Sequence, residues 1–173
     1  TELARALAEH LFGDPNRLLR IDMSEYALPG SAERLTGGPG RPGVLTGPVR
    51  DQPFTLVLLD EFEKAHESVF DLCLQIFDAG RLSDAQGTTV DFRRTIVVLT
   101  SNLGSAVPTE SSVGFGRSTP RPPDEASVTR ALREFFRPEF LNRIDRIVCF
   151  RPLALETAEK IVRRELARVL ERS

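Results

Sequence analysis

Lysine and histidine are scarce in this 173-residue chain. Basic charge comes almost entirely from arginine, because Lys64 and Lys160 are the only lysines. The two histidines, His10 and His66, have no cysteine or histidine neighbour at metal-ligand spacing, which argues against a structural zinc site. The formal net charge is only −2, so no global field draws the chain towards nucleic acid or an anionic membrane. We therefore expect neither a nucleic-acid partner nor a membrane partner.

Cysteines and long apolar runs are also few. Cys73 and Cys149 lie within apolar stretches, which predicts buried free thiols and gives no sign of an oxidising compartment. A membrane-spanning helix needs a run of about 18 apolar residues, and the sequence has none. No signal-peptide pattern opens the chain either. These absences favour an intracellular, cytoplasmic protein.

The hydrophobic content of 40% and the length suit one domain, with at most a fragment of a second. Apolar runs and periodicity predict alternating elements. The expected strands are 17–23, 54–60, 95–102 and 146–150. The expected helices are 2–12, a helix beginning near 62, about 125–136, and 155 to about 170. A surface hairpin is expected over 80–92, and 29–48 is expected to be mostly irregular. Strands alternating with helices indicate an α/β fold, a parallel sheet with helices on both faces.

Two of the expected strands run directly into polar residues. In "LVLLDEFEKAH", Asp60 and Glu61 follow four aliphatic residues, and "TIVVLTSN" ends in Ser101 and Asn102. Ligands of open parallel sheets bind beyond these carboxyl ends. Aspartate suits a hydrated Mg²⁺, glutamate can deprotonate a water, and asparagine can hold that water or a γ-phosphate oxygen. The pattern indicates phosphoryl transfer; the alternative is that the two acids merely begin a solvated helix.

Three longer segments carry a resemblance to a known family. "RIDMSEY", "LLDEFEKAHESVFDLCLQIFDAGRLSDAQGTTVDFRRTIVVLTSNLGS" and "FFRPEFLNRIDRIVCF" resemble the ATPase module of the Clp family of AAA+ protein unfoldases, namely the second ring of ClpA-, ClpB- and ClpC-type proteins. The resemblance implies an AAA+ P-loop-type sheet subdomain over 1–152. It also implies that 153–173 is the first helix of a small helical subdomain. ATP and Mg²⁺ are the implied cofactors.

The resemblance also assigns roles to individual residues. It makes "LVLLDE" the Walker B strand, with Asp60 for Mg²⁺ and Glu61 as the catalytic base. It makes Asn102 the first sensor. Arg143 of "NRID" matches the arginine finger, which reaches the ATP of the next subunit in a hexameric ring.

From its neighbours alone, Arg143 fits a surface salt bridge with Asp145 or Glu139 better than an arginine finger. The resemblance favours the finger.

The chain departs from the family at the phosphate-binding loop. The family motif is G-x-x-x-x-G-K-[ST], and "TELARALA" resembles the segment that starts at its final threonine. Thr1 would then supply a hydroxyl to Mg²⁺, and neither lysine of the chain lies in a glycine-rich loop. We expect the chain to be part of a longer polypeptide. The alternative is a degenerate module that binds ATP poorly.

Two loops bear on partners. The family's aromatic pore loop is replaced by the shorter "GGPGRPGVLTGPVR", where Arg41 and Pro42 stand near the expected tyrosine. In "SSVGFGRS", Val113, Gly114 and Phe115 resemble the loop by which some family members dock onto the ClpP peptidase. The alternative is that Phe115 packs on its own domain.

The sequence therefore predicts the ATPase module of a hexameric unfoldase or disaggregase that remodels unfolded or aggregated proteins or delivers them to a ClpP-type peptidase. A non-hydrolysing ring subunit or scaffold is one alternative. An AAA+ remodeller of another class is a second, and one acting on nucleic acid would predict a basic stripe, which the charge balance does not offer.

Overall fold

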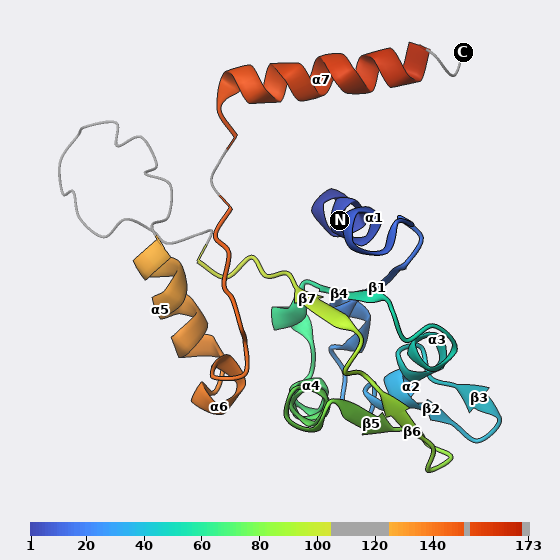
Figure 1. The fold of residues 1–173 in the computed structure, drawn as a ribbon. Helices are drawn as coiled ribbons and strands as arrows, with labels where there is room; N and C mark the ends of the chain where they lie inside the picture. The colour runs from blue at the N-terminus through green and yellow to red at the C-terminus, as the bar shows by residue number, and fades with distance from the viewer. Residues whose placement is uncertain (105–124, 151–152, 171–173) are drawn as a thin grey trace.

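A three-stranded parallel sheet, in the order β1–β4–β7, forms the centre of the fold (Figure 1). The computed structural model describes residues 1–104, 125–150 and 153–170. The strands are β1 (Leu18–Asp22), β4 (Leu56–Asp60) and β7 (Ile96–Leu99). In the register, Asp22 lies opposite Asp60 and Leu59 lies opposite Leu99. All three strands therefore end at one edge, and the three strand predictions that fall on them are confirmed.

The middle strand is buried on both faces, which explains its unbroken apolar run. Helix α1 (Glu2–Phe12) covers one face, where Ala4 and Ala8 pack against Leu56 and Leu58. The other face meets a larger core beneath α3 (Thr46–Asp51) and α4 (Glu67–Ala79). Figure 1 shows α1 above the sheet and these two helices below it. The α/β prediction, with helices on both faces, is confirmed.

Phenylalanine rings fill the larger core next to the end of β4. They come from η2 (Phe62–Lys64), α4, and the two helices α5 (Glu125–Phe135) and α6 (Pro138–Leu141) with their connection. The six rings in mutual contact are Phe62, Phe70, Phe77, Phe135, Phe136 and Phe140. Because Phe62 directly follows the acidic strand end, this cluster fixes the chain that leaves the sheet.

The helix expected from residue 62 onward is in fact two elements. Between η2 and α4 the backbone is extended at Ala65 and His66. The His66 ring accepts a hydrogen bond from the Ser68 amide at 3.2 Å and so caps α4. Histidine is not among the favoured capping residues, so the pattern of apolar spacing could not reveal this break.

The glycine- and proline-rich stretch holds more regular structure than expected. It contains α2 (Glu33–Thr36), β2 (Gly37–Gly38), β3 (Arg41–Pro42) and α3, preceded by η1 (Met23–Tyr26). Helix α3 was missed because burial rather than propensity holds it. Val49 is fully buried, and the buried Thr46 hydroxyl donates to the Thr36 carbonyl at 3.1 Å.

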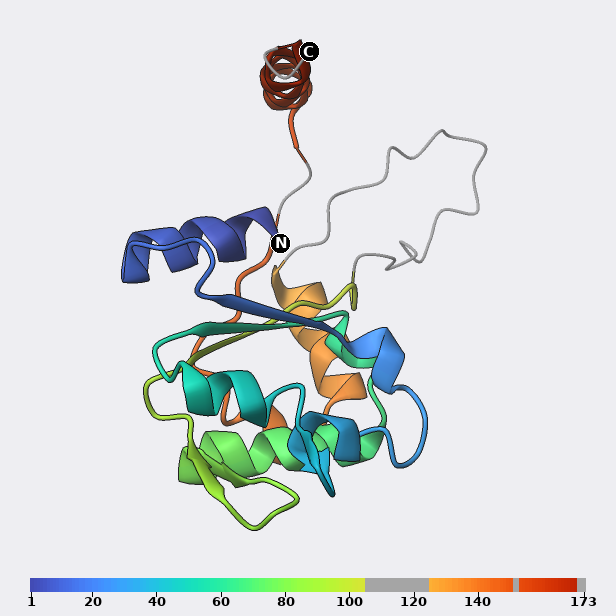
Figure 2. The same cartoon turned by 90° about the vertical axis from the view of Figure 1, so that its right-hand side faces the viewer.

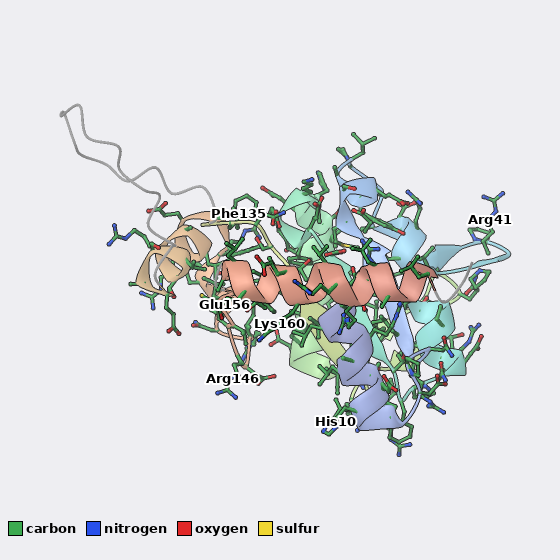
Figure 3. All side chains as sticks on the ribbon, turned by 90° about the horizontal axis from the view of Figure 1, so that it is seen from above. His10, Arg41, Phe135, Arg146, Glu156 and Lys160 are labelled. Carbon is green, nitrogen blue, oxygen red and sulfur yellow. The ribbon has the colours of Figure 1, made fainter. Side chains whose placement is uncertain are left out.

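The expected hairpin is confirmed as β5 (Arg81–Ser83) and β6 (Thr89–Asp91). The buried Asp84 side chain organises its turn by accepting from the amides of Gln86 and Thr88, at 2.9 and 2.8 Å. The Gln86 side chain in turn donates to the Gly38 carbonyl at 2.8 Å. This bond ties the β5–β6 hairpin to the β2–β3 hairpin. Figure 3 shows Arg41 on that second hairpin, projecting away from the molecule.

Gly43, which follows β3, has no room for a side chain. A Cβ there would lie 2.3 Å from the Leu35 carbonyl oxygen and 2.4 Å from the Thr36 carbonyl carbon, both rigid backbone atoms. We expect Gly43→Ala to lower the free energy of unfolding by about 1–3 kcal/mol, as overpacking does. Gly38→Ala is the matched control, because a Cβ at Gly38 meets no atom of the described part of the chain within 4 Å. Urea unfolding curves of the two variants check this, and equal midpoints would contradict the close approach.

The strand expected at 146–150 is absent from the described part of the chain, where these residues are irregular. A strand needs a hydrogen-bonding neighbour, and none of the described strands pairs with this segment. Val148 and Phe150 are accordingly 65% and 74% exposed. The last helix, α7 (Leu155–Leu170), is confirmed, and it stands apart from the sheet (Figures 1 and 2). The division into a domain over 1–152 and a second unit from 153 stays a prediction.

The two thiols differ in exposure, so the expectation that both are buried is wrong for Cys149, which is half-buried. Burial raises the pKa of the Cys73 thiol to about 12. Since the thiolate is the reactive form, we expect iodoacetamide at pH 8 to modify Cys149 and to spare Cys73 until the protein unfolds. Peptide mass spectrometry after labelling checks this, and equal labelling of the native protein would contradict it.

Among the described residues, no helix is both long and apolar enough to cross a lipid bilayer.

Candidate functional site

Asp60, at the end of the buried strand, has both carboxylate oxygens engaged. From the neighbouring strand β1, Arg20 donates to Oδ2 through Nε at 3.0 Å and Nη2 at 2.7 Å. From the other neighbour, the Thr100 hydroxyl donates to Oδ1. The Asp60 side chain is only 17% exposed, whereas that of Arg20 is 49% exposed. The three strand ends therefore converge on one carboxylate, as their parallel arrangement predicts.

These contacts also set the charge of Asp60. The Thr100 hydrogen bond lowers its pKa most, and the Arg20 guanidinium lowers it further, against a partial burial that raises it. Thr1, the predicted source of a cation-binding hydroxyl, is the exposed residue that precedes α1.

Glu61 adopts a backbone conformation that side-chain-bearing residues rarely take, with φ 55° and ψ 48°. Among the described residues it is the only non-glycine with positive φ. Such a conformation costs about 1–3 kcal/mol and persists only where its surroundings impose it. Here Thr100 imposes it, because its hydroxyl accepts from the Glu61 amide at 3.0 Å and its carbonyl accepts from the Phe62 amide at 2.9 Å. Strain of this kind clusters at functional sites.

The Glu61 carboxylate is not buried. Its side chain is 36% exposed and forms an ion pair with Lys64, three residues along η2. The same contact raises the pKa of Lys64. The carboxylate therefore stays at the surface of the sheet edge, where it is accessible to a water molecule.

Asn102 reaches the same edge from the loop after β7. Its backbone amide donates to Glu63 Oε1 at 3.1 Å, which ties this loop to η2. The other oxygen of that carboxylate, Glu63 Oε2, is buried and has no hydrogen-bond partner among the described residues. Glu63 therefore carries out a structural task that the sequence pattern did not reveal, namely holding the Asn102 backbone beside the acidic strand end.

Arg143 lies elsewhere, just after α6. Its partner is Asp78 on α4 and neither of the two acids close to it in sequence, Glu139 and Asp145. Both side chains of this pair are about half exposed, at 54% and 48%. The guanidinium is thus available at the surface, and the structure does not bring it to Asp60 of its own chain.

The predicted docking residues Val113, Gly114 and Phe115 lie outside the described residues. Two residues that touch Asp60, Arg20 and Thr100, were not singled out from the sequence. A signal for them existed: Arg20 lies two residues before the acid that ends the neighbouring strand, and Thr100 directly follows β7.

An Mg²⁺ ion fits the donors at this edge only in company with other ligands. The Asp60 carboxylate and the Thr1 hydroxyl are hard oxygen donors of the kind that Mg²⁺ prefers. No group of three or more histidine, cysteine or acidic side chains among the described residues could hold a metal. Mg²⁺ is commonly bound by one or two protein oxygens together with phosphates and water. The donor set therefore suits a cation that binds together with a nucleotide.

Comparison with known proteins agrees with this chemistry. Residues 1–147 match the family model described as AAA domain (Cdc48 subfamily). The chain is 48% identical over 170 residues to the chaperone protein ClpB of Propionibacterium freudenreichii, covering 94% of this chain and 19% of that protein. It is 44% identical over 181 residues to ClpB of Aquifex aeolicus, covering 99% of this chain and 18% of that one.

A solved structure is similar as well. A closed-state cryo-EM reconstruction of Hsp104 with ATPγS and FITC casein superimposes with a TM-score of 0.83 at 37% identity. The superposition covers 99% of this chain and 30% of the Hsp104 chain. The chain thus spans about a fifth of the length of the ClpB relatives that it matches.

Proposed function

The chain belongs to the Clp family of AAA+ ATPases, and from that premise we propose that it is the ATP-hydrolysing module of a protein unfoldase or disaggregase. The observation that carries the proposal is the edge where β1, β4 and β7 end. There a strained Glu61 lies beside an oriented Asp60, with the Asn102 loop tied to the same place.

Each of these residues has a distinct task in the proposed reaction. Glu61 orients the attacking water and accepts its proton, for which its exposed carboxylate is suited. Asn102 holds that water or a terminal phosphate oxygen. Asp60 and Thr1 hold the cation that accompanies the nucleotide. When bound, Mg²⁺ would neutralise negative charge on the phosphates.

Neither lysine of the sequence lies in a glycine-rich loop, and we propose that polypeptide outside residues 1–173 supplies the loop that grips the phosphates. Two features support this. The outer edge of β7 has no described strand beside it, and its side chains are only half-buried. The apolar segment 146–150 is also without a described strand partner. One further strand would give both of them a hydrogen-bonding neighbour.

The proposal extends to assembly. Arg143 is half exposed and remote from its own Asp60, so we propose that it acts as the arginine finger of a neighbouring subunit in a hexameric ring. The clients we propose are unfolded or aggregated proteins. The ClpB relatives are named as chaperones, and the Hsp104 structure was solved with FITC casein. Neither name includes a peptidase, so the ClpP part of the sequence-based expectation has no support. Cytoplasmic location stays a prediction.

Phosphate release by the full-length protein tests the proposed function. We expect steady-state ATP hydrolysis that requires Mg²⁺ and that increases when an unfolded protein such as casein is added. Absence of turnover, with ATP still bound, would favour the non-hydrolysing scaffold. Stimulation by DNA or RNA and not by casein would favour the nucleic-acid remodeller.

A further inference from the structure

Arg20 donates hydrogen bonds to the Asp60 carboxylate, the group to which the proposed function assigns a cation. Two of its donors, Nε and Nη2, converge on the single oxygen Oδ2 of Asp60. The other oxygen accepts from Thr100. Each carboxylate oxygen offers about two lone-pair sites, and Arg20 fills both on Oδ2, so a divalent cation that binds this oxygen has to displace the guanidinium. Thr100 also fixes the backbone of Glu61, whereas the Arg20 side chain is half exposed, so Arg20 is the donor that can leave.

A second carboxylate, that of Asp22, lies near enough to pair with the displaced guanidinium. Asp22 lies two residues beyond Arg20, on the same face of β1, and directly opposite Asp60 in the sheet register. Its Oδ1 accepts from the amide and hydroxyl of Ser24, at 3.0 and 2.6 Å. The two hydrogen bonds from Ser24 lower the pKa of Asp22 most, burial and the charge of Asp60 act against them, and the charge of Arg20 adds the smallest effect, which lowers the pKa. The two acids thus flank one arginine at the site edge.

We propose that Arg20 is a positioning residue with two alternative ion-pair partners. It pairs with Asp60 when no divalent cation is bound, and with Asp22 when a cation binds Asp60. The inference rests on the proposed function, because it assumes that a nucleotide and its cation bind at this edge. Without a bound cation, Arg20 holds the Asp60 carboxylate in place through its two hydrogen bonds to Oδ2. When a cation binds, Arg20 moves to Asp22, so the guanidinium keeps an acidic partner. Competition between Arg20 and the cation for Asp60 therefore weakens cation binding without leaving an unpaired charge.

Measurements of cation binding to the full-length protein test whether Arg20 exchanges Asp60 for Asp22 as its partner. The binding of Mn²⁺ in the presence of ADP is followed by loss of the free-ion electron paramagnetic resonance signal. The Mg²⁺ dependence of fluorescent ADP release gives a second readout that needs no turnover. Removing the competitor with Arg20→Met is expected to lower the half-saturating cation concentration by roughly twofold to fivefold, the range of a partly exposed ion pair.

Three further variants sharpen the test. Arg20→Lys keeps the charge but loses the two-donor contact, so a smaller shift in the same direction is expected, and this variant serves if Arg20→Met does not fold. Asp22→Asn removes the alternative partner of Arg20, and we expect it to raise the half-saturating cation concentration. Arg17→Met is the matched control. Arg17 precedes the same strand but donates to the Phe54 carbonyl at 3.1 Å, away from the acids, so no shift is expected.

Several results would overturn the proposal. An unchanged or higher half-saturating concentration in the Arg20 variants shows that the guanidinium does not compete with the cation. Weaker ADP binding in the absence of cation shows that it holds phosphate instead. Wild-type protein that binds no nucleotide at all defeats the proposed function itself, whereas nucleotide binding without the cation shift defeats only the role of Arg20.

Discussion

Replacing Glu61 by glutamine is expected to lower ATP turnover of the full-length protein by about 100-fold or more, the range of general-base catalysis. The amide keeps the size and polarity of the side chain but cannot accept a proton from water. Nucleotide affinity should change little, because Asp60, Thr1 and the phosphate loop hold the nucleotide in this account. The strained backbone at residue 61 is imposed by Thr100, so the substitution should leave it in place.

Steady-state phosphate release and equilibrium ATP binding, measured on the same preparation, check the Glu61 prediction. Glu9→Gln is a suitable control, because this exposed carboxylate lies on α1, outside the site. Turnover by Glu61→Gln within a few-fold of wild type would show that another group is the base. A parallel loss of ATP binding would show that Glu61 holds the nucleotide.

Arg143→Ala is expected to have the second large effect. Arginine fingers supplied by a neighbouring subunit or protein contribute about 10³-fold or more to the rate. The structure places Arg143 at the surface, with Asp78 as its partner, and a surface pair of this kind contributes about 0–1 kcal/mol to stability. Loss of turnover should therefore occur with an almost unchanged melting temperature and unchanged nucleotide affinity.

Mixing experiments distinguish a role in the neighbouring subunit from a role within the chain. Rings that contain both Glu61→Gln and Arg143→Ala subunits should regain some activity, because an intact base then faces an intact finger. No recovery at any mixing ratio would contradict the role in trans. Arg146→Ala controls for the loss of an exposed arginine nearby. If Asp78→Asn is as damaging as Arg143→Ala, the intrachain ion pair and not the finger accounts for the effect.

The sheet and its acidic edge could be predicted because they follow from local patterns. An apolar run such as 56–59 has to be buried, and parallel strands necessarily end together, so Asp60, Glu61 and the residues after β7 had to meet. The long helices were equally predictable, since α7 has the bounds that its apolar spacing indicates.

Features that depend on distant contacts could not be predicted in this way. Residues 146–150 have the apolar pattern of a strand, yet a strand forms only where a neighbour supplies hydrogen bonds. Helix α3 forms in a glycine- and proline-rich stretch because its buried residues pack onto the core. The contacts of Arg20 and Thr100 with Asp60 depend on the sheet register, which the sequence alone does not reveal.

The most direct test of the central claim is a structure of the full-length Glu61→Gln protein with ATP and Mg²⁺. We predict the terminal phosphates at the edge where β1, β4 and β7 end, with the cation contacting Asp60 and Thr1 and the γ-phosphate within reach of Asn102. Nucleotide bound at any other place on the chain, or a protein that stays empty at saturating ATP, would contradict the account.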